Sequence, residues 1–369
     1  MAHVVHEADA SQLTSVKISR EPYMAAQIVI VNGLAGCGKT MLAPIVGSLP
    51  RVELMRFNYH LETVCIMRFL DKIAEDAAVG MIRMQTDIDL YHGIMSRETN
   101  FRFSDLSSVW MNARPWRYFK RVFMAGNEAV MPRIKEERPI LNLVNHHLLG
   151  VSGPLFKALG DRLTFIELVR HPLYMVKQWY TWMPREGVDP RVFDVWIEHR
   201  GQAIPWMAVG WEDLYLESNP MDRTIYGIEN QWRLGMKALK NMPEARRDRV
   251  LMVPFEQFVL HPDPFMRRIE QLLGTRADGA TRRMMKKQNV PRKMYAEGIG
   301  LKIYRYYGWE PPEPNSTEDD ELAKRRAFVA AEATPEALKV WDRLCEEYES
   351  TYMSRSRQPR AVREKIGAV

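Results

Sequence analysis

The feature that most constrains this chain is a glycine-rich loop that follows a short apolar segment. Residues 27–32 read QIVIVN, a mostly β-branched run typical of a strand buried on both faces of a parallel sheet. The next eight residues satisfy the pattern G-x-x-x-x-G-K-[ST] in full: Gly33, Leu34, Ala35, Gly36, Cys37, Gly38, Lys39 and Thr40. After such a strand, this pattern predicts a loop whose backbone N–H groups and lysine ammonium bind phosphate groups.

Thr40, the last residue of the loop, is relevant to which nucleotide the loop binds. The Thr40 hydroxyl would hold Mg²⁺ if the ligand were ATP, and no metal site is predicted otherwise. The alternative interpretation is a glycine turn that joins a strand to a helix and binds nothing. Pro44 follows within about one turn, so we expect the helix after the loop to be kinked or short.

Similar apolar runs recur along the chain, with helix-like stretches between them. They lie at residues 51–57, 139–145, 163–169 and 250–254. Such alternation predicts an α/β fold with a mainly parallel central sheet of about five strands flanked by helices. The chain has 369 residues, of which 46% are hydrophobic, so it can bury a large core.

The pattern also predicts how the chain is divided. Residues 1–26 form a polar leader, and residues 27–309 form a nucleotide-binding transferase domain with large helical insertions near 59–137 and 181–246. The first insertion is expected to bind an acceptor. The tryptophans of the second either pack between helices or stack on carbohydrate. Residues 310–369 are predicted to be a proline-rich linker, C-terminal helices and a basic tail.

Composition narrows the class of protein further. The chain has 52 basic and 46 acidic residues, a net charge of +6 that suits an anionic ligand but does not call for nucleic acid as a partner. The three cysteines show no metal-ligand or disulfide spacing, and no apolar run is long enough to span a bilayer. We therefore expect a cytoplasmic protein. The oligomeric state is not indicated.

A second anion-binding element follows the strand predicted at residues 163–169. Arg170 lies at the carboxyl end of this strand, where ligands bind in open α/β sheets, although an arginine there can also be a salt-bridge partner. The sequence Arg170-His171-Pro172 resembles the Arg-x-Pro element of the sulfotransferase superfamily, whose donor is 3′-phosphoadenosine-5′-phosphosulfate (PAPS). In that family the arginine and a serine eight residues later bind the 3′-phosphate. Gln178 stands at the serine position here.

Three other stretches resemble the same family. Residues 139–147, PILNLVNHH, are similar to its strand that ends in a catalytic histidine, which makes His146 the first candidate and His147 the second. A histidine at such an edge can take a proton from an attacking hydroxyl, or it can merely fill space. Residues 250–274 resemble a strand, turn and helix of the family. Residues 282–293 fall where the family has a basic cofactor-binding loop.

The loop itself departs from the family. Sulfotransferases usually carry a lysine or arginine at the position of Gly36 and usually lack the Gly-Lys-Thr ending. If the resemblance holds, Lys39 has to supply this charge from another place on the loop.

Three functions remain open on this reading. The first is a sulfotransferase that moves a sulfuryl group from PAPS to a hydroxyl or amine of an unidentified acceptor, such as a carbohydrate or small metabolite. Here His146 would be the base, Lys39 and the loop amides would stabilise the leaving phosphate, and Arg170 would hold the 3′-phosphate. The alternative is an ATP- and Mg²⁺-dependent kinase on the same fold. The second alternative is a nucleotide-binding interaction module without transferase activity.

Overall fold

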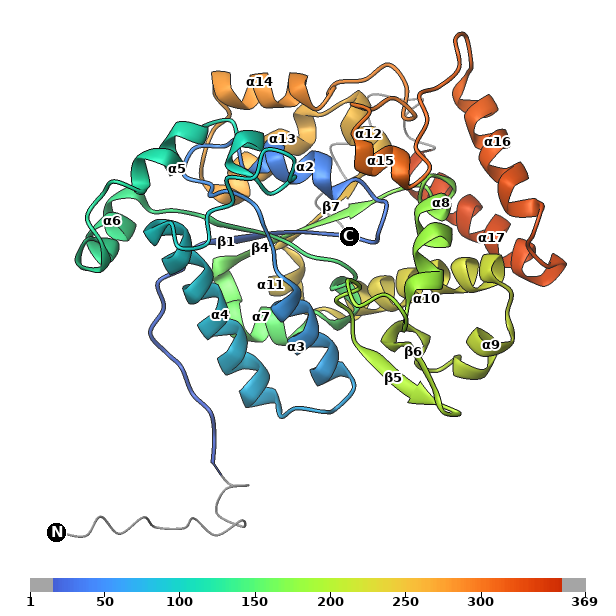
Figure 1. The fold of residues 1–369 in the computed structure, drawn as a ribbon, viewed down its shortest axis with the longest axis horizontal. Coiled ribbons are helices and arrows are strands. Elements are labelled where there is room, and N and C mark those ends of the chain that lie inside the picture. Colours follow the sequence, from blue (N-terminus) through green and yellow to red (C-terminus); the bar gives the residue numbers. More distant parts are fainter. Residues whose placement is uncertain (1–15, 354–369) are drawn as a thin grey trace.

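A central parallel sheet organises the structure, a computed structural model that describes residues 16–353 (Figure 1). The first part of the predicted leader and the predicted basic tail lie outside these residues. The strands follow the order β2-β3-β1-β4-β7. Their bounds are β1 Ile28–Asn32, β2 Arg56–Phe57, β3 Leu141–Val144, β4 Leu163–Val169 and β7 Val250–Pro254. The prediction of an α/β fold with a five-stranded parallel sheet is confirmed.

The register of the parallel strands brings their carboxyl ends to one edge of the sheet. β1 pairs with β3 and β4, so that Ile28 lies opposite both Leu141 and Leu163. Both β1 and β4 are buried along their whole length, as their apolar sequences predict. The glycine loop, the His146 segment and Arg170 follow β1, β3 and β4, and therefore leave the sheet at the same edge.

The strand predicted at residues 51–57 is much shorter in the structure, so this prediction is wrong in its length. Only Arg56 and Phe57 pair with β3, and Val52 makes an isolated bridge with Ile140. Arg51 has a positive φ of 70°, which turns the chain before a longer ladder can form.

Helices cover both faces of the sheet. In the view of Figure 1, one set lies above it: α2 Lys39–Val46, α12 Phe255–Leu260, α13 Asp263–Leu273 and α14 Gly279–Lys287. Another set lies below it: α3 Tyr59–Phe69, α4 Glu75–Met95, α7 Gly153–Leu159 and α11 Glu244–Arg247. α2 is only eight residues long and ends two residues after Pro44, as the proline predicts.

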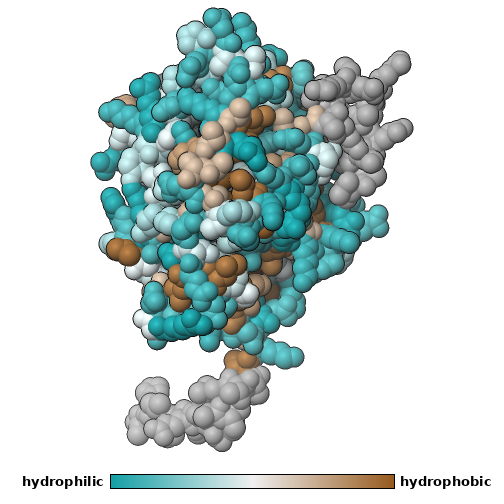
Figure 2. All heavy atoms as spheres, turned by 90° about the vertical axis from the view of Figure 1, so that its right-hand side faces the viewer, coloured by the Kyte–Doolittle hydropathy of each residue, from teal (hydrophilic) through white to brown (hydrophobic). Residues whose placement is uncertain are grey.

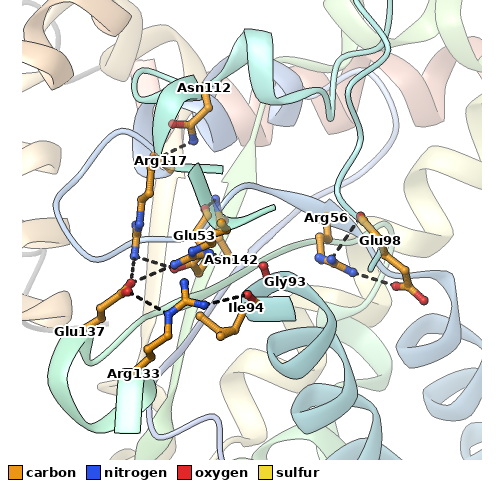
Figure 3. Close-up of polar contacts among 12 residues, drawn as sticks. Glu53, Arg56, Gly93, Ile94, Glu98, Asn112, Arg117, Arg133, Glu137 and Asn142 are labelled. Atoms are coloured by element: carbon orange, nitrogen blue, oxygen red, sulfur yellow. Dashed lines mark hydrogen bonds and ion pairs between the residues drawn. The ribbon is translucent and has the colours of Figure 1, made fainter. Parts of the chain in front are cut away.

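A buried ionic cluster fixes the first insertion to the sheet edge (Figure 3). This insertion continues from α4 into α5 Pro115–Arg121 and α6 Val130–Glu137. Arg121, whose side chain is 1% exposed, donates to Glu53 at 2.7 Å and to Glu137 at 2.9 Å. Arg117 binds the same two carboxylates at 2.8 and 2.9 Å. Paired charges of this kind set the orientation of α5 and α6, because removing one partner would leave a buried charge uncompensated.

The second insertion differs from the purely helical one predicted. Besides α9 Glu212–Glu217 and α10 Pro220–Asn241, it contains an antiparallel hairpin of β5 Trp196–His199 and β6 Gln202–Pro205. Arg200 and Gly201 form the turn with φ values of 50° and 73°. A two-residue turn with both central φ values positive matches the twist of a hairpin, and glycine favours it.

The C-terminal helices pack back onto the main body. They are α15 Lys302–Tyr306, α16 Glu318–Ala330 and α17 Pro335–Tyr348. As predicted, Thr334 caps α17 and Trp341 and Leu344 are buried on one face. α17 contacts α10 and α8, the helix Pro172–Trp182 that follows Arg170. Figure 2 shows that the side of the molecule carrying these helices is mainly hydrophilic, with scattered apolar patches. Within residues 16–353, no helix has the length and apolar character to cross a bilayer.

Candidate active site

The glycine loop after β1 is shaped by close contacts that only glycine allows. Gly33, Gly36 and Gly38 have φ values of 149°, 83° and 102°. A Cβ atom on Gly33 would lie 2.3 Å from the Leu168 carbonyl oxygen, and one on Gly38 would lie 2.6 Å from the Phe255 ring. The glycines therefore let the loop pack directly on β4 and α12.

Lys39, which was predicted to supply the positive charge of the loop, is buried within it. Its Nζ donates to the carbonyl oxygens of Gly33 and Leu34 at 2.7 and 2.8 Å, and the residue is 5% exposed. Lys39 and Thr40 open α2, so their amides have no partner within the helix and face the loop end. The Thr40 hydroxyl lies 2.8 Å from the Tyr304 hydroxyl of α15. Together these groups offer an anion several donors at one place.

A cleft of about 400 Å³ opens beside the loop. Its cationic lining comes from five residues spread over four parts of the chain: Lys39, Arg170, Lys177, Arg292 and Arg325. Aromatic rings complete the wall: Phe57, Tyr174, Phe255, Tyr304, Tyr307 and Trp309. A basic wall with aromatic faces can hold phosphate groups and stack on a planar base. Arg292 belongs to the basic segment predicted at residues 282–293, whereas α14 exposes Arg282 and Arg283.

Arg170 lies between the loop and this cleft. Its Nη1 donates to the Gly36 carbonyl oxygen at 3.0 Å, and its guanidinium lies 4.1 Å from the centre of the Phe255 ring. Among residues 16–353, no carboxylate forms an ion pair with it, and its buried Nε has no hydrogen-bond partner. Burial lowers the pKa of Arg170, and Arg325 adds to this effect. The salt-bridge interpretation of Arg170 is not supported in the described chain.

A second cavity, of about 210 Å³, adjoins the first. Its walls are largely aromatic, from Tyr59, Trp182, Phe193 and Trp206, and two acidic residues, Glu62 and Asp194, also line it. His146 lines both cavities. The imidazole therefore lies where a ligand in one cavity would meet a ligand in the other.

The ring of His146 is oriented by its neighbours. It is stacked with Phe57 and Tyr59 at centroid distances of 6.1 and 6.2 Å. A Glu62 carboxylate oxygen of α3 accepts the His146 backbone N–H at 2.7 Å and lies 3.2 Å from its Nδ1. Asn145 Nδ2 donates to the same oxygen at 3.2 Å. These contacts direct Nδ1 to Glu62 and leave Nε2 as the nitrogen that can take a proton from a ligand.

Burial changes the acidity of this pair. Burial, together with nearby Lys39, holds the pKa of His146 well below its usual value, so the imidazole is neutral at physiological pH. Burial also raises the pKa of Glu62 to about 8, despite hydrogen bonds to the carboxylate from His146 and Asn145. Glu62 therefore ionises near pH 8, where His146 is already neutral.

His147, the second candidate, occupies a different environment. It has a positive φ of 57° and is 8% exposed, and its ring packs against Trp179 and Trp182. Its backbone N–H donates to the Gly33 carbonyl oxygen at 3.4 Å. His147 lines the second cavity but not the cleft beside the loop. Geometry favours His146 over His147 as the group between the two cavities.

The remaining predicted loop residues have structural contacts. Trp179 Nε1 donates to the Ala35 carbonyl oxygen at 2.9 Å. Cys37 is fully buried, and burial raises the pKa of its thiol. Gln178 lines both cavities, and a Cβ on Gly36 would come within 3.3 Å of its Oε1. Gln178 therefore stands beside the loop, as its spacing from Arg170 predicts.

Each of the two insertions supplies some of the residues that line the second cavity. α3 of the first insertion supplies Tyr59 and Glu62, and the second insertion supplies Phe193 and Asp194. Five other aromatics of the first insertion form a series of ring contacts outside both cavities: Phe103, Trp110, Trp116, Phe119 and Phe123. All of them except Trp110 are exposed. Glu62, Tyr304 and Arg325 were not found from the sequence. Glu62 stands in the first turn of α3, where acidic residues are common, so no local signal marks it.

Comparison with known proteins gives structural similarity only. No protein-family model matches the chain, and no curated protein matches it. Three solved structures are among those similar to this chain. They are the sulfotransferase domain from the Synechococcus PCC 7002 olefin synthase (17% identity over 89% of this chain and 96% of that one, TM-score 0.40), the sulfotransferase domain from the curacin biosynthetic pathway (12%, 85% and 99%, 0.36), and sulfotransferase STF9 from Mycobacterium avium (12%, 90% and 78%, 0.39). All three are sulfotransferases. At this level of similarity, the function proposed below has to rest on the residues of the site.

The loop geometry predicts the effect of a single methyl group. In Gly38→Ala the new Cβ would collide with the Phe255 ring, so we expect the affinity for 3′,5′-diphosphoadenosine to fall by about tenfold or more. Gly210→Ala is the matched control, because Gly210 also has a positive φ of 91° but has open space around it. Isothermal titration calorimetry measures both. Unchanged affinity in Gly38→Ala would contradict this role of the loop.

Proposed function

We propose that the protein is a sulfotransferase that moves a sulfuryl group from PAPS to a hydroxyl or amine of an acceptor. The observation that carries this proposal is the position of His146, a neutral imidazole between a basic cleft and an aromatic cavity. The basic cleft suits the nucleotide donor, and the aromatic cavity suits the acceptor. The Arg-x-Pro element and the strand that ends in His146 resemble the corresponding parts of this family.

The residues of the cleft fit a donor of this kind. The loop amides and Lys39 would hold the 5′-phosphate, for which Lys39 Nζ would exchange its two carbonyl partners. Arg170 would hold the 3′-phosphate through a guanidinium that has an unpartnered buried Nε in the described chain. Gln178 would contribute an amide where the family has a serine.

The reaction needs one base and one stabiliser of negative charge. As the acceptor oxygen or nitrogen bonds to sulfur, the bond between sulfur and the 5′-phosphate oxygen breaks, and His146 Nε2 takes the acceptor proton. The products are the sulfated acceptor and 3′,5′-diphosphoadenosine. Lys39 and the loop amides oppose the charge that develops on the leaving phosphate. Glu62 acts as a positioning residue, because its carboxylate accepts from Nδ1–H and so fixes the tautomer of His146.

A kinase is the second candidate, because the loop has the full phosphate-binding pattern and ends in Thr40. In that mechanism a carboxylate that holds Mg²⁺ is expected at the end of a strand beside the loop. The two neighbours of β1 are β3 and β4, and the residues that follow them are Asn145-His146 and Arg170. The acid within β4, Glu167, accepts from Asn32 at 2.6 Å, and burial raises its pKa to about 7. These residues favour sulfuryl over phosphoryl transfer.

Cytoplasmic location remains part of the proposal. The three cysteines, Cys37, Cys65 and Cys345, are buried and free, which is compatible with a reducing compartment.

Ligand-induced stabilisation distinguishes the two donors. We expect 3′,5′-diphosphoadenosine to raise the melting temperature more than ATP with Mg²⁺, because Arg170 would bind the 3′-phosphate that ATP lacks. A ligand at a hundredfold its dissociation constant stabilises the native state by about 2.7 kcal/mol. Differential scanning fluorimetry gives the comparison. A shift seen only with ATP and Mg²⁺ would assign the site to a kinase.

The His146 and Glu62 pair predicts a pH dependence. His146→Ala should lower kcat by about 10²- to 10⁴-fold, while His60→Ala, an exposed histidine of α3, leaves it unchanged. Because Glu62 ionises as pH rises through about 8, kcat/KM should rise with pH over that range. Because the pKa of His146 is held well below its usual value, protonation of the imidazole does not lower the rate near neutral pH.

Release of 3′,5′-diphosphoadenosine from PAPS, measured with a panel of hydroxyl and amine acceptors, reports these rates. Glu62→Gln should remove the rise near pH 8 without changing affinity for 3′,5′-diphosphoadenosine. If Glu62→Gln keeps the wild-type pH profile, Glu62 does not position His146.

A further inference from the structure

An arginine from the C-terminal helices enters the cleft beside the glycine loop. Arg325 lies on α16, in the part of the chain that the sequence pattern separates from the transferase domain. It is 9% exposed and lines the cleft together with Arg170 and Arg292. Three guanidinium groups from three distant parts of the chain therefore converge on one cavity.

Two aromatic rings connect these arginines. The centre of the Tyr174 ring lies 4.9 Å from the Arg170 guanidinium and 4.3 Å from that of Arg325. The Phe255 ring lies 4.1 Å from Arg170 and 5.2 Å from Arg292. Cations over ring faces are attracted by the ring quadrupole, which lets like charges lie near one another. The rings thus hold the three guanidinium groups as a set.

The set carries more positive than negative charge. Arg325 forms an ion pair with Glu321 of its own helix at 3.3 Å. Glu256 acts on Arg170 from farther away, but its carboxylate is already bonded by the His171 N–H at 3.0 Å and by the Tyr348 hydroxyl. Within residues 16–353, neither Arg170 nor Arg292 forms an ion pair. Among the charged side chains that line the cleft, five are cationic and one, Glu297, is acidic. The site is therefore net positive even when the nearby Glu256, Glu318 and Glu321 are counted.

Unused donors point to a ligand. The Nε atoms of Arg170 and Arg325 are buried and have no hydrogen-bond partner in the described chain. Arg292 is oriented by carbonyl oxygens, with Nε donating to Asn289 at 3.0 Å and Nη1 donating to Glu297. Buried guanidinium donors without partners are costly, and an oxyanion in the cleft would satisfy them.

α16 is held in place by groups of the transferase domain. Its first residue, Glu318, accepts from the Tyr174 hydroxyl at 2.8 Å and from the Tyr295 backbone N–H. Tyr174 lies on α8, one turn after Arg170. The same tyrosine therefore orients α16 through its hydroxyl and contacts Arg170 and Arg325 through its ring.

We propose that Arg325 completes, with Arg170 and Arg292, a subsite for the second phosphate of the donor, so that the C-terminal helices form part of the nucleotide site. This inference rests on the proposed function, because it assigns this subsite to the 3′-phosphate of the sulfonated donor. A phosphate dianion would offset the excess positive charge of the cleft and pair with the unpartnered donors of Arg170 and Arg325. α16 would then be stabilised on the main body whenever the donor is bound.

Two nucleotides that differ in one phosphate test this directly. 3′,5′-Diphosphoadenosine carries the second phosphate, and adenosine 5′-monophosphate lacks it. We expect Arg325→Gln to weaken binding of the diphosphate by about tenfold or more and to leave binding of the monophosphate unchanged. Arg326→Gln is the matched control, because Arg326 is the next residue of α16, is half exposed and pairs with Asp342 away from the cleft. Isothermal titration calorimetry measures the affinities of the wild type and both variants for the two nucleotides.

The outcomes separate this inference from the proposed function. If the wild type binds both nucleotides equally, the donor assignment fails and the subsite fails with it. If the wild type prefers the diphosphate and Arg325→Gln keeps that preference, the assignment of Arg325 alone is wrong. Unchanged affinity for the monophosphate shows that the variant is folded at the loop. If both affinities fall together, Arg325 supports the fold and not the second phosphate, and the inference is overturned.

Discussion

The direct packing of the glycine loop on β4 and α12 is the constraint on which the rest of the site depends. Gly33 leaves no room for a Cβ beside the Leu168 carbonyl, and Gly38 leaves none beside Phe255. The same Phe255 ring contacts Arg170, whose guanidinium also binds the loop at Gly36. Loop, strand and basic cleft are therefore fixed relative to one another, and a phosphate bound by the loop amides necessarily lies near the arginines.

The second constraint is the low polarity around His146. Phe57 and Tyr59 stack on the imidazole, whose side chain is 27% exposed, and this partial burial makes the protonated form costly and keeps the ring neutral. The same burial makes ionisation of Glu62 costly, so its hydrogen bonds from His146 and Asn145 have to offset the loss of water. A neutral imidazole between two cavities follows from the packing of α3 on the end of β3.

Sequence reasoning succeeded where the determining interactions are local. The buried run of β1, the loop after it and the arginine at the end of β4 lie within short stretches whose composition sets their structure. Glu62 was missed because it lies 84 residues from His146 in the sequence, and only the folded chain brings the two together. Arg325 was missed for the same reason, since its helix reads as an appendage. The hairpin of β5 and β6 was missed because its strands are only four residues long and its turn has Arg200, not asparagine or aspartate, before Gly201.

A crystal structure with 3′,5′-diphosphoadenosine would show whether the glycine loop binds the nucleotide. We expect the 5′-phosphate within hydrogen-bond distance of the loop amides, with Lys39 Nζ moved from the Gly33 and Leu34 carbonyls to a phosphate oxygen. A nucleotide bound elsewhere, with Lys39 still on those two carbonyls and the loop unfilled, would contradict this expectation.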